Sequence, residues 1–127
     1  MDEEELKTRL LSDLTVLGLP IYEVKLILRP YSKTYFGRYY PTADEEKQKA
    51  RVAIYPYEVT GDFMDYSSII STGIHELCHH LQYTSGSFVR KKGVMHDTHF
   101  WKLYNHYMIK AYRLGIVQKR GECVEQC

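Results

Sequence analysis

The feature that most constrains the fold is a long amphipathic segment, residues 63–84, whose pattern is typical of one helix. Its apolar residues recur at helical spacing and form a single stripe: Ile69, Ile70, Ile74, Leu77 and Leu81. Asp62 or Asp65 is the expected N-cap of this helix. A chain of 127 residues is long enough to build one modest core around it, so we expect a single domain over residues 1–127.

Two further helices are predicted at the ends of this domain. Residues 2–17 carry leucines at helical spacing behind an acidic first turn, which complements the helix dipole. The last helix is expected over residues 97–114, with His96 or Asp97 near its N-cap. The polar tail 116–127 is expected to be flexible.

Three β-prone segments lie between the first two helices. They are residues 21–29, 34–40 and 50–57, and a turn makes the second the expected hairpin partner of the first. Pro56 cannot donate to a strand ladder, so the end of the third strand should lie at a sheet edge or outside the sheet. The predicted fold class is α+β, with a small, mostly antiparallel three-stranded sheet packed against helices.

The composition excludes several classes of protein. The net charge of +1 and the pI near 7.7 argue against a strongly basic nucleic-acid module. The 44% hydrophobic content argues against disorder, and no apolar run approaches the roughly 18 residues of a membrane helix. The chain begins with an acidic run and has three cysteines, two of them in the tail, so neither a signal peptide nor a disulfide framework is expected. We therefore expect a cytoplasmic protein without a membrane partner.

A metal-binding motif lies inside the predicted helix of residues 63–84. It is an H-E-x-x-H sequence, His75-Glu76-Leu77-Cys78-His79. Residues four apart on a helix lie about 40° apart around its axis, so His75 and His79 can share one ion. Zinc is bound by neutral imidazole nitrogen, and the glutamate of this motif takes a proton from the zinc-bound water rather than binding the metal. The pattern predicts one Zn²⁺ held by His75 and His79, with Glu76 as the general base.

A catalytic zinc site needs a third protein ligand and one open position. The candidates are His80, His96, His99, His106 and Glu122. His80 points about 100° away from its neighbour in the motif and is expected to be a solvated side chain or one that lies beside the site. His106 lies deep in the last helix, and Glu122 lies in the tail. His96 and His99 lie where the chain enters the last helix, and either could reach the metal from there.

Part of the chain resembles the small zinc metallopeptidases that include SprT-like and WLM/YgjP-like domains. The resemblance is carried by the motif and by the downstream string His96-Asp97-Thr98-His99-Phe100-Trp101. It implies a minimal zincin-like fold, with His96 as the third ligand and Phe100 and Trp101 packed beneath the site. Sixteen residues separate the motif from His96, which is closer to SprT-like spacing, but the glycines that often flank the third histidine there are replaced by Met95 and Asp97.

The motif and the resemblance together predict a zinc metalloendopeptidase that hydrolyses peptide or protein substrates through a zinc-activated water. The substrate would lie along the third strand, near residues 51–57, if that strand forms a sheet edge. Two other functions stay open. One is a non-catalytic zinc domain, and the other is a DNA-associated protein of SprT-like type. DNA contact would involve the short basic groups Arg90-Lys91-Lys92 and Lys47, Lys49 and Arg51, although solvated loops explain them as well.

Several other residues have roles that the sequence only partly defines. Cys78 is expected to be a small core residue. Asp97 is either a plain helix cap or an acceptor for a ligand imidazole. Tyrosines can stabilise an oxyanion, but the pattern selects none of the 12, and Tyr55, Tyr57, Tyr104 and Tyr107 receive no catalytic role. The oligomeric state and the role of Cys123 and Cys127 are not predicted.

Overall fold

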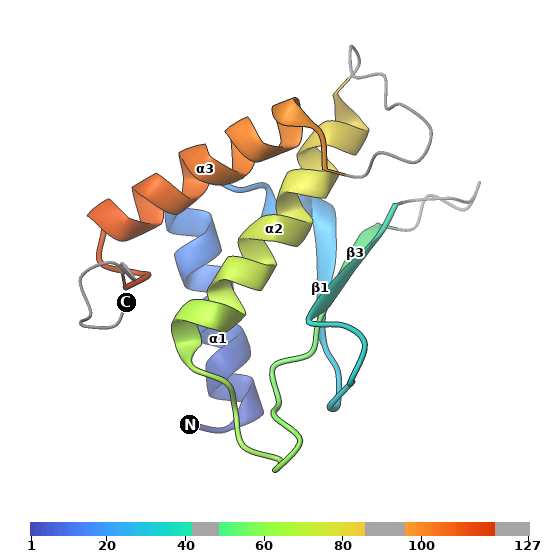
Figure 1. Ribbon diagram of the computed structural model, residues 1–127, viewed down its shortest axis with the longest axis vertical. Helices are drawn as coiled ribbons and strands as arrows, with labels where there is room; N and C mark the ends of the chain where they lie inside the picture. Colours follow the sequence, from blue (N-terminus) through green and yellow to red (C-terminus); the bar gives the residue numbers. More distant parts are fainter. Residues whose placement is uncertain (42–48, 86–95, 119–127) are drawn as a thin grey trace.

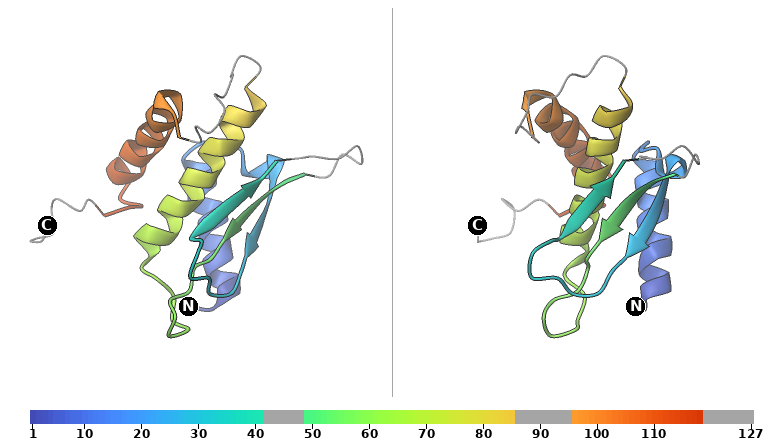
Figure 2. Two further views of the ribbon diagram at one scale, coloured as in Figure 1. Left: turned by 45° about the vertical axis from the view of Figure 1, so that its right-hand side comes forward. Right: turned by 90° about the vertical axis from the view of Figure 1, so that its right-hand side faces the viewer.

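The computed structural model describes residues 1–41, 49–85 and 96–118. The elements follow in the order α1 (Glu3–Val16), a short 3-10 helix η1 (Ile21–Glu23), β1 (Val24–Leu28), β2 (Gly37–Tyr40), β3 (Ala50–Ile54), α2 (Tyr66–Thr84) and α3 (Thr98–Arg113) (Figure 1). All three helices lie on one side of the sheet, and no described helix covers its other face (Figure 2). This is the α+β arrangement that the sequence predicts.

Each helix begins directly after an aspartate whose side chain accepts a backbone N–H of the first turn. Asp2 forms a capping box with Glu5 at the start of α1. Asp65, rather than Asp62, caps α2, and Asp97, rather than His96, caps α3. The caps satisfy N–H groups that have no partner within the helix, and this explains why the three helices begin where they do.

The strand pairing differs from the prediction. Residues 34–40 do not form a hairpin with residues 21–29; instead β2 pairs antiparallel with β3, and β1 pairs parallel with β3. The strand order is therefore β1-β3-β2 and the sheet is mixed, not mostly antiparallel. The burial of β3 explains its central place, because four of its five residues are buried and its backbone is paired on both sides.

The core lies between α2, α1 and the inner face of the sheet. The stripe of α2 predicted from the sequence is buried there together with the leucines of α1. Five side chains at its centre are 0% exposed: Leu10, Leu14, Val52, Ile70 and Ile74. Cys78 is also 0% exposed, as expected for a small core residue. Since α2 is held on one side by this core, its opposite side is free to carry the motif histidines.

Some predictions fall outside the described residues. These are the tail from residue 119 onward with Glu122, Cys123 and Cys127, the basic group Arg90-Lys91-Lys92, and Lys47. The first residues of the predicted flexible tail, 116–118, are described, and Val117 is packed into the core at 5% exposed, so flexibility was wrongly predicted for them. Within the described parts of the chain, no helix combines the length and the apolar character needed to cross a bilayer.

Candidate metal centre

Three histidine side chains from two helix regions converge at one point. His75 and His79 project from the same side of α2, with ring centroids 5.0 Å apart. His96 precedes the cap of α3 and brings its Nε2 atom to 3.0 Å from Nε2 of His75 and 3.1 Å from Nε2 of His79. The structure thus brings together the three histidines that the motif and the resemblance selected, although His96 follows His75 by 21 residues and His79 by 17.

The spacing of these nitrogens suits a small metal ion. A zinc ion about 2.05 Å from each of its tetrahedral ligands sets them about 3.3 Å apart, close to the two measured separations. One ligand atom from each of the three histidines lies within 4.8 Å of the others. Burial, and then the nearby His96, lower the pKa of His75 to about 4. His75 is therefore neutral at pH 7 and offers the lone pair that a metal requires.

His99, the other candidate for the third ligand, has a different place in the structure. Its Nδ1 atom lies 2.8 Å from Nε2 of Gln82, which also donates to Oδ1 of Asp97 at 3.1 Å. Asp97 Oδ1 accepts the backbone N–H of Phe100 as well, at 2.9 Å, so the structure gives this aspartate the capping role. The bonds from Gln82 tie the start of α3 to α2, and this connection helps to fix the position of His96.

The two remaining candidate ligands among the described residues, His80 and His106, also lie away from the three histidines. His106 is exposed on α3, with its ring 4.9 Å from that of Tyr107. His80 lies on another side of α2 and is only 4% exposed, so it is not solvated. Of the described residues, His75, His79 and His96 form the one group of three that could hold an ion.

Glu76 lies next to this group and is largely withdrawn from water. It is 6% exposed, and burial raises the pKa of its carboxyl to about 7, partly offset by the positive charge of Arg38. Within the described residues, no hydrogen bond to its carboxylate is recorded, so the group is available to a reactant. The backbone of β2 approaches closely at Gly37, where an added Cβ would lie 3.1 Å from Oε2 of Glu76 and 2.5 Å from Cγ2 of Thr72.

A cleft of about 860 Å³ opens beside the three histidines. Its walls come from α2, from His96 and from the edge strand β2. The lining residues are Tyr35, Gly37, Arg38, Tyr39, Pro41, His75, Glu76, His79, Gln82, Tyr83 and His96. The cleft therefore gives a ligand access to the histidines, to Glu76 and to the free edge of β2 at once.

Of the two aromatic residues that the resemblance placed beneath the site, Phe100 lies there and Trp101 does not. Phe100 is 0% exposed, and its ring centroid lies within 4.6–4.8 Å of all three imidazole centroids. Trp101 is 44% exposed and lies at the flank, 5.6 Å from the ring of His96. Phe100 therefore forms the floor beneath the three histidines, and Trp101 covers one side.

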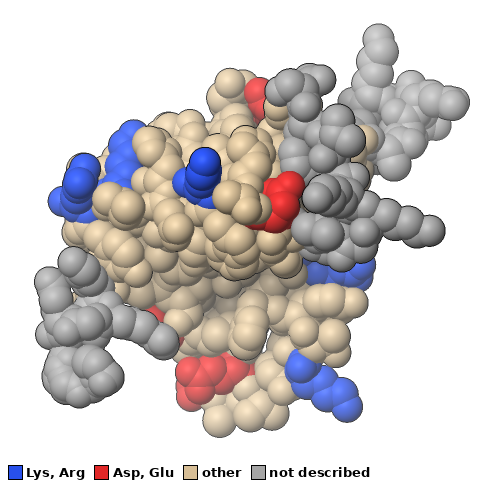
Figure 3. Space-filling model, turned by 45° about the horizontal axis from the view of Figure 1, so that its top comes forward, with Lys and Arg blue, Asp and Glu red and all other residues tan. Residues whose placement is uncertain are grey.

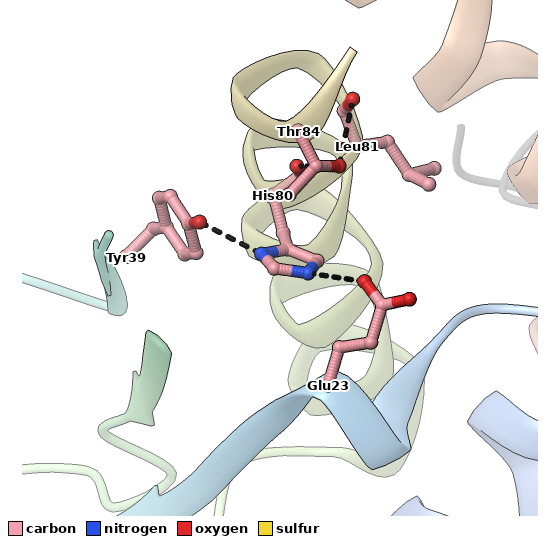
Figure 4. A network of polar contacts seen from close by, with 5 residues as sticks. All are labelled: Glu23, Tyr39, His80, Leu81 and Thr84. Carbon is pink, nitrogen blue, oxygen red and sulfur yellow. Dashed lines mark hydrogen bonds and ion pairs between the residues drawn. The ribbon is translucent and has the colours of Figure 1, made fainter. Parts of the chain in front are cut away.

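A buried polar network around His80 was not predicted from the sequence (Figure 4). Nε2 of His80 lies 2.8 Å from Oε1 of Glu23, and Nδ1 lies 2.7 Å from the hydroxyl of Tyr39. Each ring nitrogen of His80 thus has one hydrogen-bond partner, the carboxylate of Glu23 or the hydroxyl of Tyr39. The network links η1, β2 and α2. A usable signal was present in the sequence, since His80 is seven residues from Gly73 and three from Leu77, on the buried side of the helix.

We predict that Tyr39→Phe lowers the free energy of unfolding by about 1–3 kcal/mol, because it leaves a buried imidazole nitrogen without its partner. Burial raises the pKa of Tyr39 above its ordinary value, which agrees with a hydroxyl that keeps its proton and donates it. Urea denaturation followed by circular dichroism measures the change. Tyr22→Phe is the matched control, since Tyr22 is 72% exposed. Equal stabilities of the two variants would show that the hydroxyl contributes nothing.

Comparison of the chain with models of known protein families, with curated proteins and with solved structures gave no match. The resemblance to small zinc metallopeptidases stays a prediction from the motif and its downstream string. The case for a function therefore depends on the geometry of the residues themselves.

Proposed function

We propose that this chain is a zinc-dependent metallopeptidase that hydrolyses peptide bonds. The observation that carries the proposal is the convergence of three histidine nitrogens beside the buried carboxylate of Glu76, at the wall of an open cleft. His75, His79 and His96 are the proposed ligands of one Zn²⁺. When bound, the ion would supply a Lewis acid that polarises the scissile carbonyl and lowers the pKa of water.

Glu76 is the proposed general base and acid. Its position next to His75 on α2, with its side chain at the cleft wall, allows it to take a proton from the attacking water and pass it to the leaving amine. Gly37 supports this role, because a side chain there would collide with Thr72 and press on Glu76. The absence of a Cβ at this position lets β2 border the cleft closely.

The substrate-binding edge needs a correction. The sequence predicts it near residues 51–57, but β3 is the central strand and both of its edges are already paired. The strand edge that borders the cleft belongs to β2, which pairs on one side only. We propose that an extended peptide lies along Gly37–Tyr40 and forms backbone hydrogen bonds there, which give affinity without strong sequence preference.

The geometry favours this function over a structural zinc site. Structural zinc is held by four protein ligands, whereas a catalytic ion keeps one position open. The described residues bring three ligands together and leave a cleft beside them. Each of these features fits catalysis better than a structural role. For the location of the protein we propose a reducing compartment, the cytoplasm, which suits the buried thiol of Cys78.

A DNA-associated role has less support. Lys49 and Arg51 are exposed, but the other basic residues named for it lie outside the described parts of the chain. On the one face that Figure 3 draws, the described Lys and Arg side chains are scattered among uncharged residues. Arg51 does share the sheet with three other exposed cations, Lys25, Arg29 and Arg38. Salt-dependent DNA binding that persists without zinc would favour this alternative.

The first test is zinc content. We expect elemental analysis of untagged protein to find about one zinc per chain, as a three-histidine site with one open position predicts. His96→Ala should lower the zinc content strongly, whereas His99→Ala should retain it, since His99 contacts Gln82 rather than the other histidines. Protein that contains no zinc and takes up none on titration would refute the proposal. An equal loss of zinc in both variants would show that His96 has been wrongly assigned as the third ligand.

The second test is hydrolysis of an unfolded protein substrate. Cleavage should stop when a chelator removes the metal and should resume when zinc is added back. Bound zinc without any cleavage, together with unfolding on chelation, would show that the metal is structural.

A further inference from the structure

The side of the sheet that faces away from the helices carries an unusual set of residues. The strand register places Lys25, Arg51 and Tyr40 in one row and Ile27, Ala53 and Arg38 in the next. Backbone hydrogen bonds from Arg29 to Ile54 and from Tyr55 to Phe36 extend the sheet by one more row. We call these residues the outer sheet face: Lys25, Ile27, Arg29, Arg38, Tyr40, Arg51, Ala53 and Tyr55. In the right-hand view of Figure 2 this face is turned to the viewer, with the helices behind it.

The outer sheet face is positively charged although the whole chain is nearly neutral. Its four cations are Lys25, Arg29, Arg38 and Arg51, all of them exposed. It contains no acidic residue, and the two ion pairs recorded in the described structure involve Arg9 and His80 instead. Four exposed positive charges, in strand rows that hold no described acidic residue, form a surface that attracts a polyanion.

Tyrosine rings hold the guanidinium groups of this face in place. The guanidinium carbon of Arg51 lies 4.7 Å from the ring centroid of Tyr40, and that of Arg38 lies 5.0 Å from the same centroid. Arg38 also stacks on Tyr35 at 4.5 Å. Stacking orders the guanidinium plane before a ligand arrives, and the N–H edge remains free to bind a carboxylate with two hydrogen bonds.

We propose that the outer sheet face binds an acidic segment of another polypeptide, through pairing of its aspartate or glutamate carboxylates with these cations. Arg38 also lines the cleft, so the face continues into the proposed catalytic cleft across the edge strand β2. An extended chain could occupy both surfaces. The binding surface itself does not depend on the proposed peptidase activity.

The same observations disfavour other occupants. Single-stranded nucleic acids gain much of their affinity by stacking bases on aromatic rings. Here guanidinium groups already stack on the rings of Tyr35 and Tyr40. A second copy of the chain packed through this face would bring its cations against like charges, which is unfavourable.

Fluorescence anisotropy with a labelled Glu/Ser-rich peptide tests the proposal directly on the full chain. We expect saturable binding that weakens as the salt concentration rises, and no binding of the same peptide with Gln in place of Glu. The variant K25Q/R29Q/R51Q should bind about tenfold more weakly or worse, since each exposed ion pair contributes a factor of about 1.4 to 5. These three positions lie outside the cleft, so zinc content should not change.

The matched control is K7Q/K102Q/R113Q, which removes the same charge from exposed positions on α1 and α3. If affinity depends on local ion pairs, each contributing a factor of about 1.4 to 5, this variant loses none of them. Its affinity for the acidic peptide should then stay within about twofold of that of the unchanged protein. An equal loss of affinity in both triple variants would show that net charge alone governs binding, and this would overturn the proposal. So would tighter binding of oligothymidylate of the same charge, or no binding of the acidic peptide at all. If circular dichroism shows that the first variant is unfolded, peptide binding by the single variant Lys25→Glu tests the proposal instead. The side chain of Lys25 stacks on no described ring, so its replacement should not disturb the fold.

Discussion

Glu76→Gln is expected to lower kcat for peptide hydrolysis by about 10²–10⁴-fold while zinc stays bound. Glutamine has nearly the same shape as glutamate but cannot take a proton from the attacking water. The three histidines that hold the metal are unchanged, because the carboxylate of Glu76 is not one of the proposed ligands. Cleavage of a fluorogenic peptide library at saturating zinc measures kcat, and elemental analysis of the same samples measures the metal.

The control for this variant is Glu58→Gln, which changes an exposed carboxylate outside the cleft. We expect it to keep both full activity and full zinc content. If Glu76→Gln retained full activity, the proposed mechanism would be wrong even if zinc is present. If it lost the metal, the loss of turnover would say nothing about proton transfer, and Glu76 would have to be assigned to metal binding.

Phe100→Ala is expected to lower the free energy of unfolding by about 3–5 kcal/mol, the usual cost of removing a buried aromatic ring. Phe100 is 0% exposed and contacts the imidazole rings of all three proposed ligands. The cavity should also let His75, His79 and His96 move, so zinc should bind more weakly. Urea denaturation with and without a chelator separates the packing contribution from the contribution of the metal.

Trp101→Ala provides the comparison for this prediction. Trp101 follows Phe100 in sequence and is larger, but 44% of it is exposed and it lies at the flank of the histidines. Its removal should therefore cost clearly less stability than the removal of Phe100. A larger loss in Trp101→Ala would mean that the floor of the site has been assigned to the wrong ring.

The helices of this protein were predictable because their signals are local. Apolar spacing identified α1 and α2, and an aspartate stands before each helix as its cap. The motif fixed His75, Glu76 and His79 relative to one another through helix geometry alone. The choice between His96 and His99 was not local, because both lie near the start of α3. The structure separates them, since His96 meets His75 and His79 whereas His99 contacts Gln82.

The sheet was predicted less well than the helices. The strands were found, but a turn between two β-prone segments suggested a hairpin that the structure replaces with the order β1-β3-β2. Pairing partners depend on which strand takes the central place in the sheet. Here the buried strand β3 takes it and pairs at both edges, which the loop that joins two strands does not determine. The wrong pairing also misplaced the expected substrate edge, which belongs to β2.

The sequence by itself determined which residues can bind a metal and on which side of a helix two of them lie. Only the tertiary structure decided that His96 meets them, that Glu76 lies against the backbone of β2 at Gly37, and that His80 is bonded to Glu23 and Tyr39. It also decided that four scattered cations share one face of the sheet. The physical reason is the range of the interactions. Helix periodicity and caps act within a few residues, whereas the hydrogen-bond contacts among these histidines, Glu23 and Tyr39 join positions 17 to 57 residues apart. They form only when a common core brings those segments together.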